Sequence, residues 1–204
     1  MSQLIIENAI ATDEWTRVVP PVLGDEPVRR QAGKVVLFKL HGEETFTNKQ
    51  IQATEIPATG KILLPLTVWL ANKEVLSDRM SDGEVGILLT THEPIESLIE
   101  AFNDLNSLPL IAVFVERFPD GRNFTLGNLL RTRYGYQNEL RAVGDVLRDQ
   151  LYFLKRSGFN SYEIREDRNA EEAIASLSDF TEPYQGAVDD TQPVWRRTDR
   201  GQLS

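Results

Sequence analysis

The chain of 204 residues, with 41% hydrophobic and 26% charged side chains, is long enough to bury the core of one domain. Its 31 acidic and 22 basic residues give a formal net charge of -9, which repels phosphate backbones and anionic lipid, so general nucleic-acid binding is not expected. The absence of cysteine excludes disulfides, thiolate metal sites and cysteine nucleophiles.

Nothing in the sequence indicates a membrane segment. The longest apolar block, residues 62–71, contains Pro65 and Thr67 and is about half as long as a membrane span requires. The first seven residues lack the cationic flank and the apolar run of a signal peptide. We therefore expect a soluble, cytoplasmic protein that binds neither membranes nor nucleic acid.

Three regions of the chain differ in pattern. Residues 1–60 are repeatedly interrupted by proline and glycine, and we interpret them as an irregular, β-rich N-terminal arm or extension. Residues 61–185 are predicted to form an α/β domain, and residues 186–204 a polar C-terminal tail. The elements predicted before residue 85 are two strands and one helix, at residues 35–40, 62–66 and 68–79.

From residue 85 onward, short apolar runs alternate with helical periodicity. After the run at residues 85–89, apolar residues recur every three or four positions as far as Leu105, which is the spacing of one helical face. Three further units repeat this order, and Gly158 is a predicted left-handed cap. The four predicted strands are residues 85–89, 110–115, 139–143 and 161–165, and the predicted helices carry the apolar residues found between 95 and 105, 126 and 130, 147 and 154, and 169 and 180.

Repeated strand–helix units predict an α/β fold with a parallel sheet of at least four βα units, because each crossover returns the chain in the same direction. The pattern leaves two architectures open, an open doubly wound sheet and a partial barrel. In both, ligands gather at the carboxyl ends of the strands, where the helices begin. We therefore expect the functional residues in the loops that follow the strands.

Carboxylates stand in two of these loops. A carboxylate at a strand end can act as a general acid or base, so Asp120 and Asp145 are the candidate catalytic residues. The simpler alternatives are a turn at Asp120-Gly121 and a helix N-cap at Asp145. His92, which follows the first of the four strands, is interpreted as a solvent-exposed loop residue.

Arginine is concentrated between residues 117 and 168, which carry ten basic and seven acidic side chains in an otherwise acidic chain. Arginine is favoured over lysine where a planar fork must bind an oxyanion at two points. Arg141 falls inside an apolar strand, where a charge needs a carboxylate or a ligand as its partner. The predicted anion-binding residues are Arg122, Arg141 and Arg131, with Asp120 and Asp145 as orienting carboxylates.

The alternative for Arg141 is an internal salt-bridge network with Glu116, Asp145 or Asp149. Further residues predicted on the same rim are Glu116, Arg117 and Asp149. If Glu116, Asp120 and Asp145 converge, their oxygens can bind Mg²⁺. Because no glycine-rich dinucleotide motif or P-loop is present, we predict no bound cofactor, and we predict no dedicated metal site.

Several short motifs together resemble one family. They are Phe118-Pro-Asp-Gly-Arg122, Leu129-Leu-Arg131, Tyr134-Gly135, Glu139-Leu-Arg-Ala-Val-Gly-Asp-Val146, Asp149-Gln-Leu151 and Gly158-Phe159. The chain is similar, over roughly residues 60–185, to an uncharacterised bacterial family classed as a domain of unknown function. Its members are sometimes labelled oxidoreductase-like and are often encoded beside assimilatory sulfite or nitrite reductase. Ser157 stands where this resemblance leads us to expect a cysteine.

Three hypotheses about function follow. The resemblance implies an accessory protein of assimilatory sulfur (sulfite) or nitrite metabolism, which would bind a small oxyanion or the reductase itself at the arginine-rich rim. The first alternative is an α/β enzyme that uses the same aspartates and arginines, with or without Mg²⁺. The second is a non-catalytic interaction module, with Trp15 and Trp195 as candidate anchors because aromatic residues beside arginine are common at interfaces.

Overall fold

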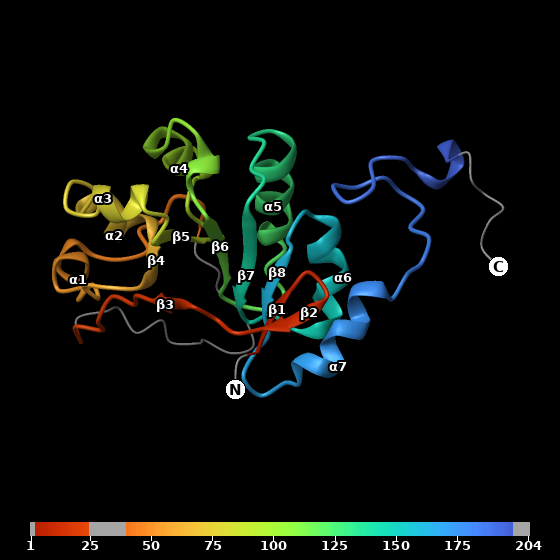
Figure 1. Ribbon diagram of the computed structural model, residues 1–204, viewed down its shortest axis with the longest axis horizontal. Helices are drawn as coiled ribbons and strands as arrows, with labels where there is room; N and C mark the ends of the chain where they lie inside the picture. Colours follow the sequence, from red (N-terminus) through yellow and green to blue (C-terminus); the bar gives the residue numbers. More distant parts are fainter. Residues whose placement is uncertain (1–2, 25–39, 198–204) are drawn as a thin grey trace.

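The computed structural model describes residues 3–24 and 40–197, which form an α/β fold with an eight-stranded sheet and seven α-helices (Figure 1). The predicted strand at residues 35–40 lies outside the described residues except for Leu40. The strands are β1 (Leu4–Ile6), β2 (Ala9–Ala11), β3 (Trp15–Arg17), β4 (Lys61–Pro65), β5 (Val85–Thr90), β6 (Leu110–Val115), β7 (Glu139–Gly144) and β8 (Ser161–Glu163). The helices are α1 (Asn48–Gln52), α2 (Leu66–Ala71), α3 (Ser77–Ser81), α4 (Ile95–Ala101), α5 (Arg122–Thr132), α6 (Arg148–Arg156) and α7 (Ala170–Ile174).

The sheet has the strand order β2-β1-β8-β7-β6-β5-β4-β3. Strands β3 to β8 are parallel and follow one another in chain order, which confirms the predicted parallel βα units. Strand β1 pairs antiparallel with β8, and β2 pairs antiparallel with β1, so the sheet is mixed. The expectation of a sheet that is parallel throughout is therefore wrong at this edge.

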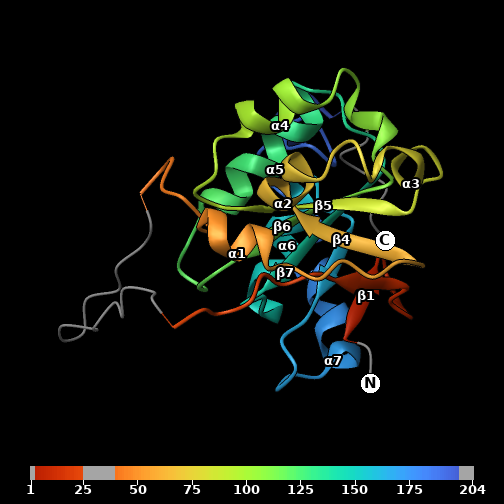
Figure 2. The same cartoon turned by 90° about the vertical axis from the view of Figure 1, so that its left-hand side faces the viewer.

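Because the parallel strands never reverse their order, successive right-handed crossovers carry the helices to the same side of the sheet. Figure 1 shows the helices fanning around the strands from α2, through α5, to α6 and α7, and Figure 2 shows α4 and α5 on one side of β4 to β7. The sheet is curled into a half-barrel. The partial barrel is thus correct, and the open doubly wound sheet, which requires a reversal of strand order, is wrong.

The strand sequences explain this layering, since β5 and β6 are apolar on both faces. On the helix side, alternate residues such as Ile87, Ile111 and Val113 join the main core. On the inner side a smaller core is formed by the buried side chains of Leu63, Leu88, Leu110, Ala112 and Val143, with Trp15 and Phe114 packed against it.

The first 60 residues supply strands to both edges of this one sheet. Strands β1 and β2 form a hairpin through a turn that contains Glu7, the one described non-glycine residue with a positive φ, at 55°. Strand β3 pairs with β4 at the opposite edge. The connection between β2 and β3 therefore takes the chain from one edge of the sheet to the other.

The end of α6 follows a local sequence signal, whereas several other helices and one strand differ from their predicted bounds. Gly158, at φ 101°, closes α6 in a Schellman motif, with its N–H bonded to Lys155 O at 2.9 Å and the next N–H bonded to Leu154 O at 3.1 Å. The helix predicted at residues 68–79 is two short helices, α2 and α3. The helix predicted at residues 169–180 becomes a 3₁₀ turn after Ile174, and β8 ends at Glu163, two residues before its predicted end.

Two ion pairs connect distant parts of the curled sheet on its inner side. Arg17 of β3 donates to Glu163 of β8. Four strands separate β3 from β8, so in a flat sheet they would lie about 24 Å apart, farther than these two side chains reach together. Arg141 of β7, with 1% of its side chain exposed, bonds to Glu139 at 2.8 Å and to Asp13 at 2.9 Å. Asp13 lies just before β3, so this pair also joins the two edges.

We expect the substitution Arg141→Met to lower the free energy of unfolding by about 3 kcal/mol, because it leaves two carboxylates without their shared cation. This loss of stability is at the lower end of the range of about 3–5 kcal/mol for breaking a buried ion pair. The reason is that Asp13 and Glu139 retain 30% and 21% side-chain exposure and can be partly hydrated. Urea denaturation measures the change. The exposed Arg133→Met is the matched control and should change the stability by less than about 0.5 kcal/mol; equal effects of the two substitutions would contradict the role of Arg141.

Candidate functional site

The carboxyl ends of β5 to β8 meet along one edge of the half-barrel, because these strands are parallel neighbours. Several polar residues on this edge are buried, which distinguishes it from an ordinary solvated surface. The buried members are Thr91, His92 and Glu93 after β5, Asp120 and Asn123 around the start of α5, and Gln150 in α6.

Asp120 and Arg122 form a tight pair at the start of α5. Both nitrogens Nε and Nη2 of Arg122 donate to the carboxylate of Asp120 at 2.8 Å, and the backbone N–H of Arg122 adds a third hydrogen bond at 3.1 Å. Thr91, at the end of β5, donates its hydroxyl to the same carboxylate. Asp120 therefore ties the β5 and β6 loops together, and it does more than form the turn with Gly121.

The pKa of Asp120 lies below its ordinary value as a result of two opposing effects. Burial is the largest single influence and raises the pKa, but the hydrogen bonds from Arg122 and Thr91 and the charge of Arg122 together outweigh burial. Asp120 is thus a carboxylate at neutral pH, and it holds the Arg122 guanidinium in place.

His92 is buried, with 3% exposure, so its interpretation as a solvent-exposed loop residue is wrong. Its Nε2 lies 3.1 Å from the hydroxyl of Thr45, and its carbonyl accepts a hydrogen bond from Gly42 N at 2.8 Å. The neighbouring Glu93 accepts hydrogen bonds from the N–H and the hydroxyl of Thr90 at 2.7 and 2.9 Å. Residues 40–47 cover the end of β5 here, and no local sequence signal at His92 indicates a partner so far away in the chain.

Asp145 connects the loops that follow β6, β7 and β8. Its carboxylate accepts a hydrogen bond from Phe118 N at 2.8 Å and pairs with Arg165 at 2.8 Å. Arg165 also pairs with Asp167 at 2.6 Å. The expected N-cap role of Asp145 is not observed, because Leu147 occupies that position of α6.

The three predicted anion-binding arginines lie in different places. Arg122 is on the carboxyl edge, whereas Arg141 lies on the inner face and pairs with Glu139 and Asp13, not with the acidic residues of the rim. Arg131 lies at the opposite end of the sheet. Its guanidinium donates to carbonyl oxygens just before β7 and β8, those of Tyr136, Asn138 and Gly158, at 2.7 to 2.9 Å.

The remaining rim residues are mostly exposed. Glu116 is exposed and Arg117 is half-buried in the loop between β6 and α5, and the Arg117 carbonyl accepts a hydrogen bond from Asp120 N at 3.0 Å. Among residues 3–24 and 40–197, no three Asp, Glu or His side chains are arranged to hold a metal ion. Glu116, Asp120 and Asp145 therefore do not converge as a set of metal ligands.

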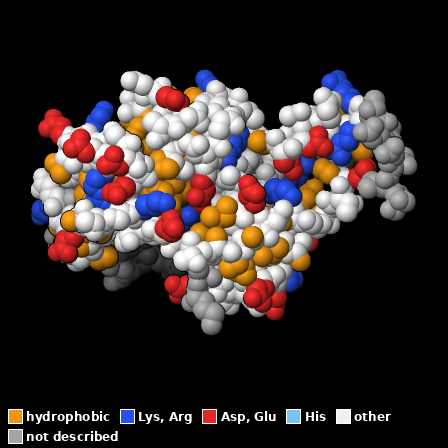
Figure 3. All heavy atoms as spheres, viewed as in Figure 1, with side chains coloured by type: hydrophobic (Ala, Val, Ile, Leu, Met, Phe, Trp, Pro, Cys, Tyr) orange, Lys and Arg blue, Asp and Glu red, His pale blue; other side chains and the backbone are white. Residues whose placement is uncertain are grey.

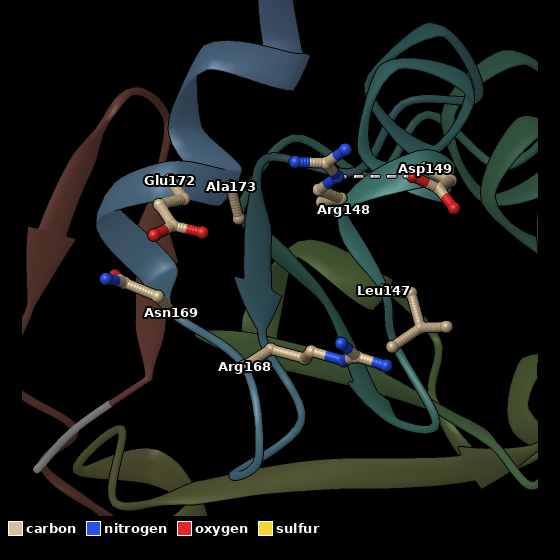
Figure 4. A pocket seen from close by; sticks show the side chains of 7 residues that line it. All are labelled: Leu147, Arg148, Asp149, Arg168, Asn169, Glu172 and Ala173. Carbon is tan, nitrogen blue, oxygen red and sulfur yellow. Dashed lines mark ion pairs between the residues drawn. The ribbon is translucent and has the colours of Figure 1, made fainter.

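A pocket of about 260 Å³ lies farther along the carboxyl edge, between the starts of α6 and α7 (Figure 4). It is lined by Leu147, Arg148, Asp149, Arg168, Asn169, Glu172 and Ala173. Figure 4 shows Arg148 extending toward Ala173, Arg168 extending along another wall toward Leu147, and the Glu172 carboxylate on the α7 wall. Arg168 follows a predicted strand, but the sequence does not indicate that Arg148 and Glu172 face the same space.

The cations of this pocket are only loosely paired within the protein. Arg148 Nε lies 3.5 Å from Asp149 Oδ1, and Arg168 Nε lies 3.7 Å from Asp167 Oδ2, distances too long for strong hydrogen bonds. All four side chains are more than half exposed. By contrast, Arg122 and Arg141 are each tightly paired with carboxylates. The arginines of the pocket therefore keep N–H donors that a ligand can use.

A second exposed feature is the C-terminal segment after α7, which projects from the body of the molecule (Figure 3). Its backbone folds back on itself through a hydrogen bond from Val194 N to Tyr184 O at 3.1 Å and is attached to the end of α6 by one from Val188 N to Arg156 O at 3.0 Å. Tyr184 and Trp195 contact each other, with ring centroids 4.9 Å apart, and remain 70% and 51% exposed. Trp15, the other predicted anchor, packs on the inner core instead.

These features define an α/β half-barrel with a polar carboxyl edge, and no helix in the described part of the chain is long and apolar enough to cross a membrane. Residues 86–195, more than half of the chain, match a family described as bacterial protein of unknown function (DUF934), and the chain belongs to that family. The match spans β5 to β8, the pocket and most of the C-terminal segment. No match to the chain was found among curated proteins or among solved structures.

We expect Asp120→Asn to reduce stability at neutral pH and to weaken the acid dependence of unfolding. A carboxyl group with a lowered pKa stabilises the folded protein above its unfolded pKa of about 4, and this contribution is lost as the pH falls through the folded pKa. The stability gap between wild type and variant should therefore be largest at pH 7 and shrink below pH about 4. Urea unfolding at a series of pH values measures it, with the exposed Asp179→Asn as control; a gap independent of pH would refute this role of Asp120.

Proposed function

We propose that this protein is an accessory protein of assimilatory sulfite or nitrite metabolism and that it binds a small oxyanion at the carboxyl edge of its half-barrel. The observation that carries the proposal is the pocket between α6 and α7, with Arg148 and Arg168 on two of its walls. Guanidinium groups bind planar and tetrahedral oxyanions through paired N–H donors.

The position of the pocket supports anion binding. In βα folds, anionic groups bind in the loops after the strands, beside helix N-termini whose first N–H groups have no partner within the helix. Helix α6 begins with Arg148 at this pocket. A further basic side chain, Arg165, lies in the neighbouring loop and is already paired with Asp145 and Asp167.

The metabolic assignment rests on the resemblance to the bacterial family whose members are often encoded beside assimilatory sulfite or nitrite reductase. The enzyme hypothesis has less support, because the two candidate catalytic carboxylates, Asp120 and Asp145, are both engaged by arginine and by backbone N–H groups. Binding an anion does not require either carboxylate to exchange a proton, whereas acid–base catalysis does.

We expect sulfite, nitrite, sulfate or phosphate to bind the wild-type protein in calorimetric titrations at low ionic strength. Each of the variants Arg148→Gln and Arg168→Gln should weaken binding by roughly fivefold, the value of a partly exposed charged contact. The variant Arg133→Gln removes one charge at an exposed site elsewhere and is the matched control for each of them. If none of the four anions binds, or if the control weakens binding as much as the pocket variants do, the proposal is wrong.

A genetic test addresses the metabolic role. Deletion of the gene should impair growth on sulfate or on nitrate as the only source of sulfur or nitrogen. Unimpaired growth on both would contradict the accessory role even if an anion binds in vitro.

A second candidate function is docking to the reductase itself, and the exposed pair Tyr184–Trp195 favours it. Tryptophan, tyrosine and arginine dominate the energetics of protein interfaces, and Arg196 and Arg197 follow Trp195 directly. The hydrogen bonds of the segment hold the two rings in place before binding, which lowers the entropic cost of association.

For this second candidate we expect Trp195→Ala to weaken binding to the purified assimilatory reductase of the same organism by about 2 kcal/mol or more, measured by biolayer interferometry. Its effect on folding should be small, since half of the indole is already exposed. Val75→Ala removes a side chain that is 82% exposed elsewhere and should leave binding unchanged. Equal binding by wild type and Trp195→Ala would eliminate this surface.

A further inference from the structure

The pocket between α6 and α7 is larger than an inorganic oxyanion. Its volume of about 260 Å³ corresponds to roughly nine water molecules at liquid density. Sulfite or nitrite, with four or three heavy atoms, would fill only part of it. A ligand that uses the whole pocket must therefore carry further atoms beyond its anionic end.

The acidic side chain of the pocket, Glu172, indicates the chemistry of those further ligand atoms. Glu172 presents its carboxylate from α7, while the two arginines occupy the other walls (Figure 4). A carboxylate is unfavourable for a ligand that is only an anion, and it is a partner for an ammonium group.

Glu172 is also not used by its own helix. Its position, three residues after Asn169, resembles a capping box, in which its side chain would bond back to the Asn169 N–H. The box does not form, because Asn169 Oδ1 accepts from Glu171 N at 2.8 Å and not from Glu172 N, and the Glu172 side chain makes no hydrogen bond or ion pair with any described residue. Its carboxylate is therefore free to meet a ligand.

From this arrangement we propose that the pocket takes a small zwitterion, with its sulfonate, sulfinate or carboxylate end between Arg148 and Arg168 and its ammonium end at Glu172. This inference rests on the proposed function, since it requires that the pocket bind an anionic group at all. It adds the ligand class, and it gives Glu172 the role of selecting zwitterions over simple anions of similar size.

Two probes that differ only at the cationic end test the inference. Taurine carries a sulfonate and an ammonium group, whereas isethionate carries the sulfonate and a neutral hydroxyl. We expect the wild-type protein to bind taurine with a dissociation constant about five- to tenfold lower than that of isethionate, in calorimetric or NMR titrations at low ionic strength.

The variant Glu172→Gln should bring the two dissociation constants together, mainly by weakening taurine. Glu171→Gln removes the same charge from the adjacent residue, which does not line the pocket, and should preserve the preference. Isethionate carries a net charge and taurine does not, so Glu171→Gln also measures how far the loss of one surface charge by itself changes the ratio of the two dissociation constants.

The outcomes separate this inference from the proposed function. Equal binding of taurine and isethionate by the wild type, or a preference that survives Glu172→Gln, overturns the zwitterion while leaving oxyanion binding intact. Binding of sulfite without binding of taurine or isethionate would also overturn the zwitterion inference and leave oxyanion binding intact. If no oxyanion binds, the proposed function fails and the inference fails with it.

Discussion

The architecture depends on the buried guanidinium of Arg141. A charge on the inner face of a curled sheet is tolerated only because Glu139, two residues away on the same strand, and Asp13, from the connection between the two edges, both bond to it. Arg17 and Glu163 add a second link between β3 and β8. These pairs join the segment around β3 to β7 and β8, which are not its neighbours in the strand order, and so they stabilise the curl of the sheet.

The same edge combines two kinds of charged group with different properties. Near β5 and β6, Asp120 and Arg122 are bonded to each other and to Thr91, so their charges mainly stabilise loop structure. Near β7 and β8, the arginines of the pocket have only long contacts with carboxylates. Tight internal pairing and availability for a ligand exclude each other, which is why the pocket, and not the Asp120 cluster, is the candidate site.

Much of the fold could be predicted from the sequence because its strands and helices have strong periodicity. Strands β5 to β7 lie where the apolar runs are, and Gly158 ends α6 as expected. The pattern could not reveal that β1 and β2 add antiparallel strands at the sheet edge, since both are three residues long and β8, the strand that pairs with β1, lies far later in the chain. It also could not separate a partial barrel from a doubly wound sheet, because strand order is a property of tertiary packing.

The site was harder to predict than the fold for a similar reason. Residue type identified arginine as important, but one partner of each of two arginines, Asp13 for Arg141 and Gly158 for Arg131, lies in a segment that no local pattern connects to it. His92 is buried by residues 40–47, which are also distant from it in the sequence. In the sequence Glu172 resembles a capping-box residue and Arg148 an ordinary charged residue in the first turn of a helix, and only the packing of α6 beside α7 places them around one pocket.

The two outermost strands, β2 and β3, are each only three residues long. An unpaired strand edge is a template on which another chain can add a strand, and its length limits how many backbone hydrogen bonds such an intruder can form. Short edge strands on both sides therefore protect this half-open sheet against strand addition and polymerisation into fibrils. A fully closed barrel avoids this hazard because it has no edge strand.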